Sequence, residues 1–287
     1  MEVWTGAMSR ASSAPNESRT NVPGTDKRSE LSLLLEATQE LARRAGGVAL
    51  RHFRSTLTVE AKTDGSPVTI ADRSAEETAR EWITRRFPAD GILGEEFGAH
   101  LPAAKRRWII DPVDGTKTFV RGVPLWGTLI AVCEDETVLA GAAFFPAVDE
   151  IVGAAPGLGC WWNGTRTHVS NVAALEDATV LTTDGRFKRT PERAAGWQRL
   201  ATAAAISRTW GDCYGYLLVA TGRAEVMVDG LVAPWDAAAL LPVITEAGGV
   251  FTDWNGTPTA FGGSIVATNA TLAEQARELL GATIPAR

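Results

Sequence analysis

An apolar run that ends in two carboxylates constrains the fold of this chain more than any other feature. Residues 108–117 read Trp-Ile-Ile-Asp-Pro-Val-Asp-Gly-Thr-Lys, so Asp111 and Asp114 lie three residues apart with Pro112 between them. An apolar run bounded in this way predicts a buried strand that ends in a tight turn. Because open α/β sheets bind ligands at the carboxyl ends of their strands, both acids are expected at such an edge.

Carboxylates crowded at one strand end are hard oxygen ligands, which Mg²⁺ prefers. Gly115 and Thr116 follow the acids, and we expect them to open a helix whose first N–H groups face an anion. The pattern Asp-x-x-Asp-Gly is also a good turn sequence. This segment alone therefore leaves a metal site and a plain turn open.

Two further segments also place acids beside apolar runs. Glu95 and Glu96 follow a short apolar run, and Asp236 falls in the first turn of an expected apolar helix that Pro234 opens. Taken singly, each is also explained as a solvated loop charge or as an acid that complements a helix dipole. Their combination favours one shared site, because removing a lone carboxylate from water is costly.

Together these segments resemble the Mg²⁺-dependent phosphatases of the inositol-monophosphatase-like family. The family's signatures stand here as Gly-Glu-Glu at 94–96, the run at 108–116, and Trp-Asp-Ala-Ala-Ala at 235–239. They occur in the family's order and at similar spacing, and the resemblance extends from Leu31 to the C-terminus. It implies an αβαβα five-layer sandwich with no clean boundary between domains.

Within that family, the residues after the second signature look more like the histidinol-phosphate phosphatase branch. Lys117 is followed by Thr-Phe-Val-Arg-Gly-Val-Pro, whereas inositol-phosphate enzymes more often carry Thr-Asn-Phe after Asp-Gly-Thr. The segment 210–216, Trp-Gly-Asp-Cys-Tyr-Gly-Tyr, also looks like that branch.

The resemblance implies an active site with two or three Mg²⁺ ions. One ion would take Glu95, Asp111 and the carbonyl of Val113. The other would take Asp111, Asp114 and Asp236. Two divalent ions about 4 Å apart can hold the attacking and leaving oxygens in line and neutralise developing charge.

The resemblance also implies that Asp72 and Thr116 deprotonate the attacking water and that Glu96 contributes with a weaker role. Read from its residues alone, the stretch 69–72 has the form of a helix-starting box. In that reading Asp72 is an acid in the first turn of a helix and needs no catalytic role.

Substrate contacts are expected from the residues that follow the acids. The N–H groups of Gly115, Thr116 and Lys117 are predicted to cradle the phosphate. Asp212 and Asp229 are candidates for the rest of the substrate, since histidinol phosphate carries an amine and an imidazole that acidic side chains recognise. An alternative of equal weight is that both are ordinary loop acids.

The remaining pattern predicts a layered α/β or α+β fold, because strands and helices are mixed along the chain. Residues 1–29 are predicted to form a disordered tail, and residues 30–287 the phosphatase domain. Pro242 is expected to kink one helix. The expected helices are 31–53, 69–87, 191–205, 213–222, 234–247 and 271–280. The expected strands are 58–61, 91–94, 107–111, 126–133, 137–145, 149–154, 167–169, 180–182, 208–210, 224–228, 251–253 and 265–268.

Net charge and cysteine content indicate which kinds of partner and which cellular compartment are favoured. The net charge of −6 disfavours nucleic acid and anionic membranes as partners. No apolar run is long enough to span a membrane. Three cysteines without a Cys-x-x-Cys pair favour a reduced, cytoplasmic setting. A homodimer is expected from the frequency of such assemblies and from the resemblance.

These observations predict a Mg²⁺-dependent phosphate monoesterase whose partner is a small phosphorylated metabolite, most specifically histidinol phosphate. An inositol 1-phosphate or broad sugar-phosphate phosphatase is the main alternative. An inactive homologue with a binding or regulatory role is a further one, disfavoured because every metal-ligand acid is present. Cys160 and Arg166 have the spacing of cysteine phosphatases, but the residues between them signal a hairpin rather than an anion-binding loop.

Overall fold

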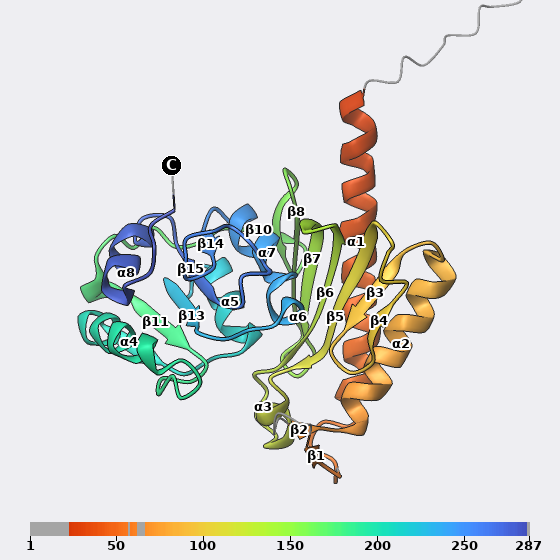
Figure 1. Ribbon diagram of the computed structural model, residues 1–287, viewed down its shortest axis with the longest axis horizontal. Coiled ribbons are helices and arrows are strands. Elements are labelled where there is room, and N and C mark those ends of the chain that lie inside the picture. Colours follow the sequence, from red (N-terminus) through yellow and green to blue (C-terminus); the bar gives the residue numbers. More distant parts are fainter. Residues whose placement is uncertain (1–22, 57, 62–66, 286–287) are drawn as a thin grey trace, which may run out of the picture.

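Five layers of secondary structure make up the fold, in the order helices, sheet, helices, sheet, helices (Figure 1). The computed structural model describes residues 23–56, 58–61 and 67–285. Three buried apolar clusters fill the spaces between the layers. The predicted αβαβα sandwich is therefore confirmed.

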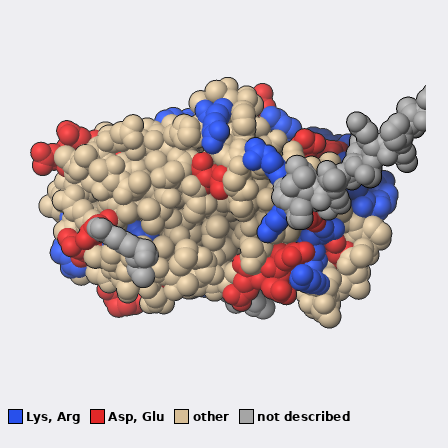
Figure 2. Space-filling view, turned by 90° about the horizontal axis from the view of Figure 1, so that it is seen from above, with Lys and Arg blue, Asp and Glu red and all other residues tan. Residues whose placement is uncertain are grey.

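Helices α1 (Pro23–Leu50) and α2 (Ile70–Arg86) form the first layer and cover one face of the larger sheet. Small residues on both helices are fully buried, among them Ala45 and Ala75. At Gly46 a side chain would meet the ring of Phe144 at 2.8 Å, so the helix and the sheet approach each other closely there. Seen from above, positive and negative side chains are mixed at the end of the molecule that these helices form (Figure 2).

The start of α1 corrects the predicted tail. The helix begins at Pro23, so residues 23–29 are helical rather than disordered, while 1–22 lie outside the described residues. These added turns are mostly polar and exposed from Lys27 onward. Apolar periodicity cannot detect such turns. Directly after them, the carboxylate of Glu30 lies 3.2 Å from the guanidinium of Arg106 on β5.

The larger sheet has eight strands in the order β10-β9-β8-β7-β6-β5-β3-β4. Strands β3 and β5 are parallel and every other neighbouring pair is antiparallel. Sequence reasoning missed β4, a short edge strand with little apolar character. The strands are β3 (Gly91–Gly94), β4 (Gly98–His100), β5 (Arg106–Asp114), β6 (Gly127–Glu134), β7 (Thr137–Phe145), β8 (Glu150–Ala155), β9 (Gly159–Trp162) and β10 (Thr165–Thr167).

Helices α5 (Cys213–Ala220), α6 (Pro234–Ala237) and α7 (Leu240–Glu246) lie between the two sheets. The single kinked helix expected at 234–247 is instead two helices separated at residues 238–239. Proline lacks an N–H and its ring crowds the carbonyl four residues earlier. For Pro242 that carbonyl belongs to Ala238, so the chain breaks where the lost bond would have been.

The smaller sheet has the order β12-β11-β13-β15-β14 and is covered on its outer face by two helices. Most boundaries fall within two residues of those predicted, the usual scatter at element ends. The elements are β11 (Thr179–Thr182), β12 (Ile206–Arg208), β13 (Val226–Asp229), β14 (Val250–Thr252), β15 (Ile265–Thr268), α4 (Pro191–Ala203) and α8 (Ala273–Leu280). Outside both sheets lie the short pair β1 (Glu60–Ala61) and β2 (Pro67–Val68), the helix α3 (Thr116–Val120) and a 3-10 turn (Leu175–Asp177).

Among the described residues, the helices are all too short or too polar to cross a lipid bilayer.

Candidate metal centre

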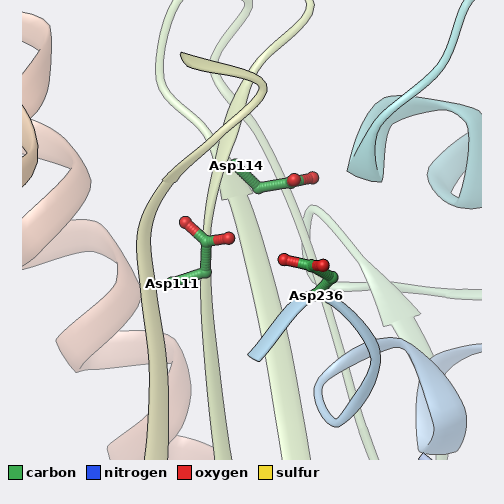
Figure 3. Close-up of side chains that lie close together, drawn as sticks. All are labelled: Asp111, Asp114 and Asp236. Carbon is green, nitrogen blue, oxygen red and sulfur yellow. The ribbon is translucent and has the colours of Figure 1, made fainter. Parts of the chain in front are cut away.

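Three carboxylates meet between the larger sheet and the central helices. Asp111 and Asp114 come from β5 and Asp236 from α6, and one oxygen from each lies within 4.8 Å of the others. All three side chains point into the same small space (Figure 3). The sequence motifs that suggested a shared site are thus brought together, although Asp236 is more than a hundred residues from the other two.

A β-bulge explains how two acids three residues apart reach the same space. Strand β5 does not end at Asp111, as the sequence suggested, but continues to Asp114. Side chains alternate along a strand, so residues three apart would face opposite sides. Asp111 lies opposite Leu129 and Asp114 opposite Gly127, which leaves one extra residue on β5. The extra residue between Asp111 and Asp114 resets the alternation.

Asp236 holds its own helix and contributes to the cluster. One of its oxygens accepts a hydrogen bond of 2.7 Å from the N–H of Ala233 at the start of α6. This is the capping role that the sequence offered as the plain alternative. The same side chain also supplies an oxygen to the acidic cluster, so its capping role is compatible with the predicted metal-binding role.

Electrostatics in the cluster call for a cation. Burial, followed by the charges of Glu95 and the neighbouring acids, raises the pKa of Asp111 well above its usual range. Burial, then the charge of Asp212, does the same to the pKa of Asp114. Burial raises the pKa of Asp236 to about 6. Hard carboxylate oxygens that repel one another in a buried space fit Mg²⁺ as the compensating ion.

We expect the stabilisation by Mg²⁺ to depend on pH. Because the pKa of Asp236 in the folded chain lies above its ordinary value of 3.8, the metal-free fold binds the proton more tightly than the unfolded chain. From this group, the free energy of unfolding therefore falls as pH rises from about 4 to about 6. Protons and metal compete for the same oxygens. The Mg²⁺-induced rise in unfolding midpoint should be larger at pH 8 than at pH 5, and equal rises would contradict this.

Glu95 lies beside the cluster on the turn after β3. Its N–H donates a 3.2 Å hydrogen bond to the carbonyl of Ile110 on β5, which sets its backbone next to Asp111. Its charge contributes to the raised pKa values of Asp111 and Asp236. The N–H of Glu96 is bound by another carboxylate, that of Glu76 on α2. The catalytic role of Glu96 stays a prediction.

Asp72 joins the same region from α2. One oxygen accepts hydrogen bonds from the N–H and the hydroxyl of Thr69, at 2.8 and 2.6 Å, and so forms the predicted helix-starting box. The other oxygen lies 3.3 Å from the hydroxyl of Thr116, which is also 3.0 Å from the carbonyl of Val113. Burial raises the pKa of Asp72. The cap and the contact with Thr116 therefore coexist.

The expected phosphate cradle opens α3. Gly115 precedes this helix with a φ of 87°, a conformation that favours glycine. A Cβ there would also lie only 3.1 Å from the carboxylate of Asp212. Gly115, Thr116 and Lys117 line a cavity of about 400 Å³ together with Glu95 and Asp236. The cradle thus shares a cavity with Asp236 of the acidic cluster and with Glu95.

The two acids assigned to the rest of the substrate lie at different depths. Asp212 lines the 400 Å³ cavity and accepts a 3.2 Å hydrogen bond from the hydroxyl of Thr118. Asp229 is buried beside it, and its two oxygens accept hydrogen bonds from the N–H of Thr183 and the hydroxyl of Tyr216, at 3.1 and 2.8 Å. Burial raises the pKa of Asp229 to about 7. A smaller cavity of about 90 Å³ touches both acids.

Several residues around the centre were not found from the sequence. The N–H of Cys213, at the start of α5, donates to a carboxylate oxygen of Asp114. Thr183 and Tyr216 hold Asp229, and Glu76 binds the turn that carries Glu95. Of these, only Glu76 had a visible signal, an acid one helical turn after Asp72. The other contacts join segments far apart in the chain, and no local pattern indicates them.

Cysteine phosphatase chemistry is disfavoured by the surroundings of Cys160. This residue lies in β9 and is fully buried. Burial raises the pKa of its thiol to about 12, whereas a cysteine nucleophile needs a lowered pKa.

Comparison with known proteins agrees with the geometry. The model of the inositol monophosphatase family matches residues 30–286. The histidinol-phosphatase of Chlorobaculum parvum is 44% identical over 77% of this chain and 86% of its own length. That of Mycobacterium tuberculosis is 38% identical over 87% and 95%. An inositol monophosphatase structure from Zymomonas mobilis superimposes with a TM-score of 0.77, at 32% identity, over 88% of this chain and 98% of that one.

Proposed function

Because this chain belongs to the inositol monophosphatase family, whose members are phosphoric monoester hydrolases, we propose that it hydrolyses L-histidinol phosphate to L-histidinol and phosphate. The observation that carries the chemistry is the meeting of Asp111, Asp114 and Asp236 around one small space. The histidinol-phosphatases among its relatives, together with Asp212 in the lining of the cavity, favour the substrate.

Metal binding is assigned to the residues that surround the acidic cluster. One Mg²⁺ would be held by Glu95, Asp111 and the carbonyl of Val113, and another by Asp111, Asp114 and Asp236. When bound, two such ions lower the pKa of the attacking water and neutralise charge on the phosphoryl group. The acids of the chain would hold both ions in place.

The Thr116–Asp72 pair is assigned the role of accepting the proton of the attacking water. The hydroxyl of Thr116 lies 3.3 Å from the carboxylate of Asp72, close enough to pass a proton to it. Thr69 holds the other oxygen of that carboxylate, so its orientation is constrained before substrate arrives. Phosphate oxygens would accept hydrogen bonds from the N–H groups of Gly115, Thr116 and Lys117, and Glu96 would support this side of the site.

The leaving alcohol would extend from the cradle toward Asp212 and Asp229. Asp212 faces the 400 Å³ cavity and suits the substrate's ammonium group, with which it would form a charge-assisted hydrogen bond. Asp229, held by Thr183 and Tyr216, sits beyond it beside the smaller cavity and suits the imidazole. Both contacts are part of the proposal.

An inositol 1-phosphate phosphatase is the second candidate. The Zymomonas mobilis inositol monophosphatase has a closely similar fold, and a ring of hydroxyl groups also needs acceptors such as Asp212 and Asp229. The metal chemistry would be the same for both substrates. Only the groups beyond the phosphate differ, so a direct comparison of substrates separates the two.

The substrate assignment predicts a strong preference in turnover. Phosphate release with Mg²⁺ should show kcat/KM for histidinol phosphate about a hundredfold above that for inositol 1-phosphate, because neutral hydroxyl groups form weaker hydrogen bonds with Asp212 and Asp229 than a charged ammonium or imidazolium group does. EDTA should abolish both activities. Preference for inositol 1-phosphate would keep the metal chemistry and reject the substrate. Turnover that resists EDTA would reject the metal centre.

We further propose a cytoplasmic homodimer. Cys133, Cys160 and Cys213 are all buried free thiols, which suits a reducing compartment. Dimers are the commonest closed assemblies of soluble proteins. Light scattering of the purified chain tests the assembly directly, and a monomeric mass would reject it.

A further inference from the structure

A buried acid on α2 holds the turn that carries Glu95. The side chain of Glu76 is fully buried, and its carboxylate accepts hydrogen bonds from the N–H groups of Glu96 and Phe97, at 2.7 and 3.2 Å. Bonds from backbone N–H groups to a carboxylate are charge-assisted and stronger than neutral ones. The backbone that directly follows Glu95 is therefore fixed to α2.

Arg80, one turn later on α2, completes this attachment. Its Nε donates a 2.7 Å hydrogen bond to the carboxylate of Glu76, so the buried negative charge is paired. Its guanidinium also donates to the carbonyl of Gly98 and lies 5.8 Å from the ring centre of Phe97. Glu76 binds the start of the turn and Arg80 binds its end.

The residue before Glu95 is held just as closely. At Gly94 a Cβ would overlap the carboxylate of Glu76, so the chain passes directly over that side chain. The N–H of Glu95 itself donates to Ile110 on the neighbouring strand. Attachments on both sides of Glu95 leave its backbone little freedom. Its side chain is close enough to affect the charges of Asp111 and Asp236.

We propose that Glu76 and Arg80 are positioning residues that set the backbone of Glu95 for metal binding before a metal arrives. The carboxylate of Glu76 is engaged with the turn and with Arg80, and this residue lines neither cavity of the site. Partners of this kind typically change metal affinity by about 10- to 100-fold when removed. The inference rests on the metal centre proposed above.

The test is calorimetric titration of the metal-free full chain with Mg²⁺ alone. Glu76→Gln removes the charge that holds two N–H groups, and we expect affinity for one ion to fall at least about tenfold. Glu77→Gln is the matched control, since it removes a charge from the adjacent exposed position of the same helix. Its affinity should stay within about twofold of the unmodified chain.

A double-variant cycle separates positioning from a purely structural role. If Glu76 acts through Glu95, the pair Glu76→Gln and Glu95→Gln should bind Mg²⁺ no more weakly than Glu95→Gln alone, within about twofold. Additive losses would overturn the inference. In turnover assays, Glu76→Gln should need about tenfold more Mg²⁺ for half-activation, with kcat at saturating Mg²⁺ close to that of the unmodified chain.

Arg80→Lys keeps the test open if Glu76→Gln fails to fold. Lysine keeps the positive charge but loses the planar guanidinium that binds Glu76 and Gly98 together. We expect a several-fold loss of Mg²⁺ affinity, and unchanged affinity would overturn the inference. Failure of the unmodified chain to bind Mg²⁺ would instead reject the proposed metal centre, so the two failures are distinguishable.

Discussion

Replacing Asp111 by Asn is expected to abolish turnover while the metal-free chain stays folded. Asp111 is assigned to both metal ions. Its replacement would therefore disturb both of the positive charges that stabilise the reacting phosphate. Metal stabilises transition-state charge by several kcal/mol, and about 4 kcal/mol corresponds to a loss of about a thousandfold in kcat. Steady-state phosphate release at saturating Mg²⁺ measures this loss.

The metal-free stability should move in the opposite direction. Burial, with the charges of Glu95, Asp114 and Asp236, disfavours the ionised form of Asp111 in the absence of metal. A neutral amide of nearly the same shape removes that repulsion. We therefore expect the unfolding midpoint of metal-free Asp111→Asn to equal or exceed that of the unmodified chain at pH 8, with little further rise on adding Mg²⁺.

Asp90→Asn is the matched control, because Asp90 is buried but serves the fold alone. Its carboxylate accepts hydrogen bonds from Arg106 and Trp108, at 2.8 and 3.0 Å. Breaking these contacts should lower the unfolding midpoint and leave kcat within about threefold, since weakening a buried pair destabilises the fold. Full turnover by Asp111→Asn would reject the assignment of Asp111 as a metal ligand.

The acids of the centre were predictable because each lies directly at the end of a short apolar segment. The local pattern marked Asp111, Asp114, Glu95 and Asp236 as candidates, and the resemblance supplied their assignment to a metal. The layered fold was predictable for the same reason, since apolar periodicity marks buried elements. The alignment of these segments in space came from the resemblance rather than from any single pattern.

What escaped prediction depends on contacts between distant segments or on polar turns. The bulge in β5 is set by pairing with β6. The local sequence predicted a turn after Asp111 and gave no indication that the strand continues to Asp114. Glu76 looks like half of an ordinary surface pair with Arg80, because nothing local shows that the turn after β3 folds over it. The first turns of α1, residues 23–29, lack the apolar spacing that marks a helix.

Substitution of Asp72 by Asn distinguishes the capping role of this residue from its proposed catalytic role. Asp72→Asn should lower kcat by about 10²- to 10⁴-fold, the usual contribution of a general base, while Mg²⁺ affinity changes little. The amide oxygen of Asn can still accept the bonds from Thr69 that cap α2, so the unfolding midpoint should change little. A cap alone would predict normal kcat for Asp72→Asn, because this variant keeps the cap.

Thr116 gives the same test from the other side of the pair. Thr116→Ser keeps a hydroxyl within reach of Asp72 and should retain kcat within about tenfold, whereas Thr116→Ala removes it and should lose about as much kcat as Asp72→Asn. A proton acceptor works only when ionised, so activity should rise with pH through the raised pKa of Asp72. That acidic limb should be missing from the residual activity of Asp72→Asn. If Thr116→Ala matches Thr116→Ser in kcat, the proton does not pass through this hydroxyl.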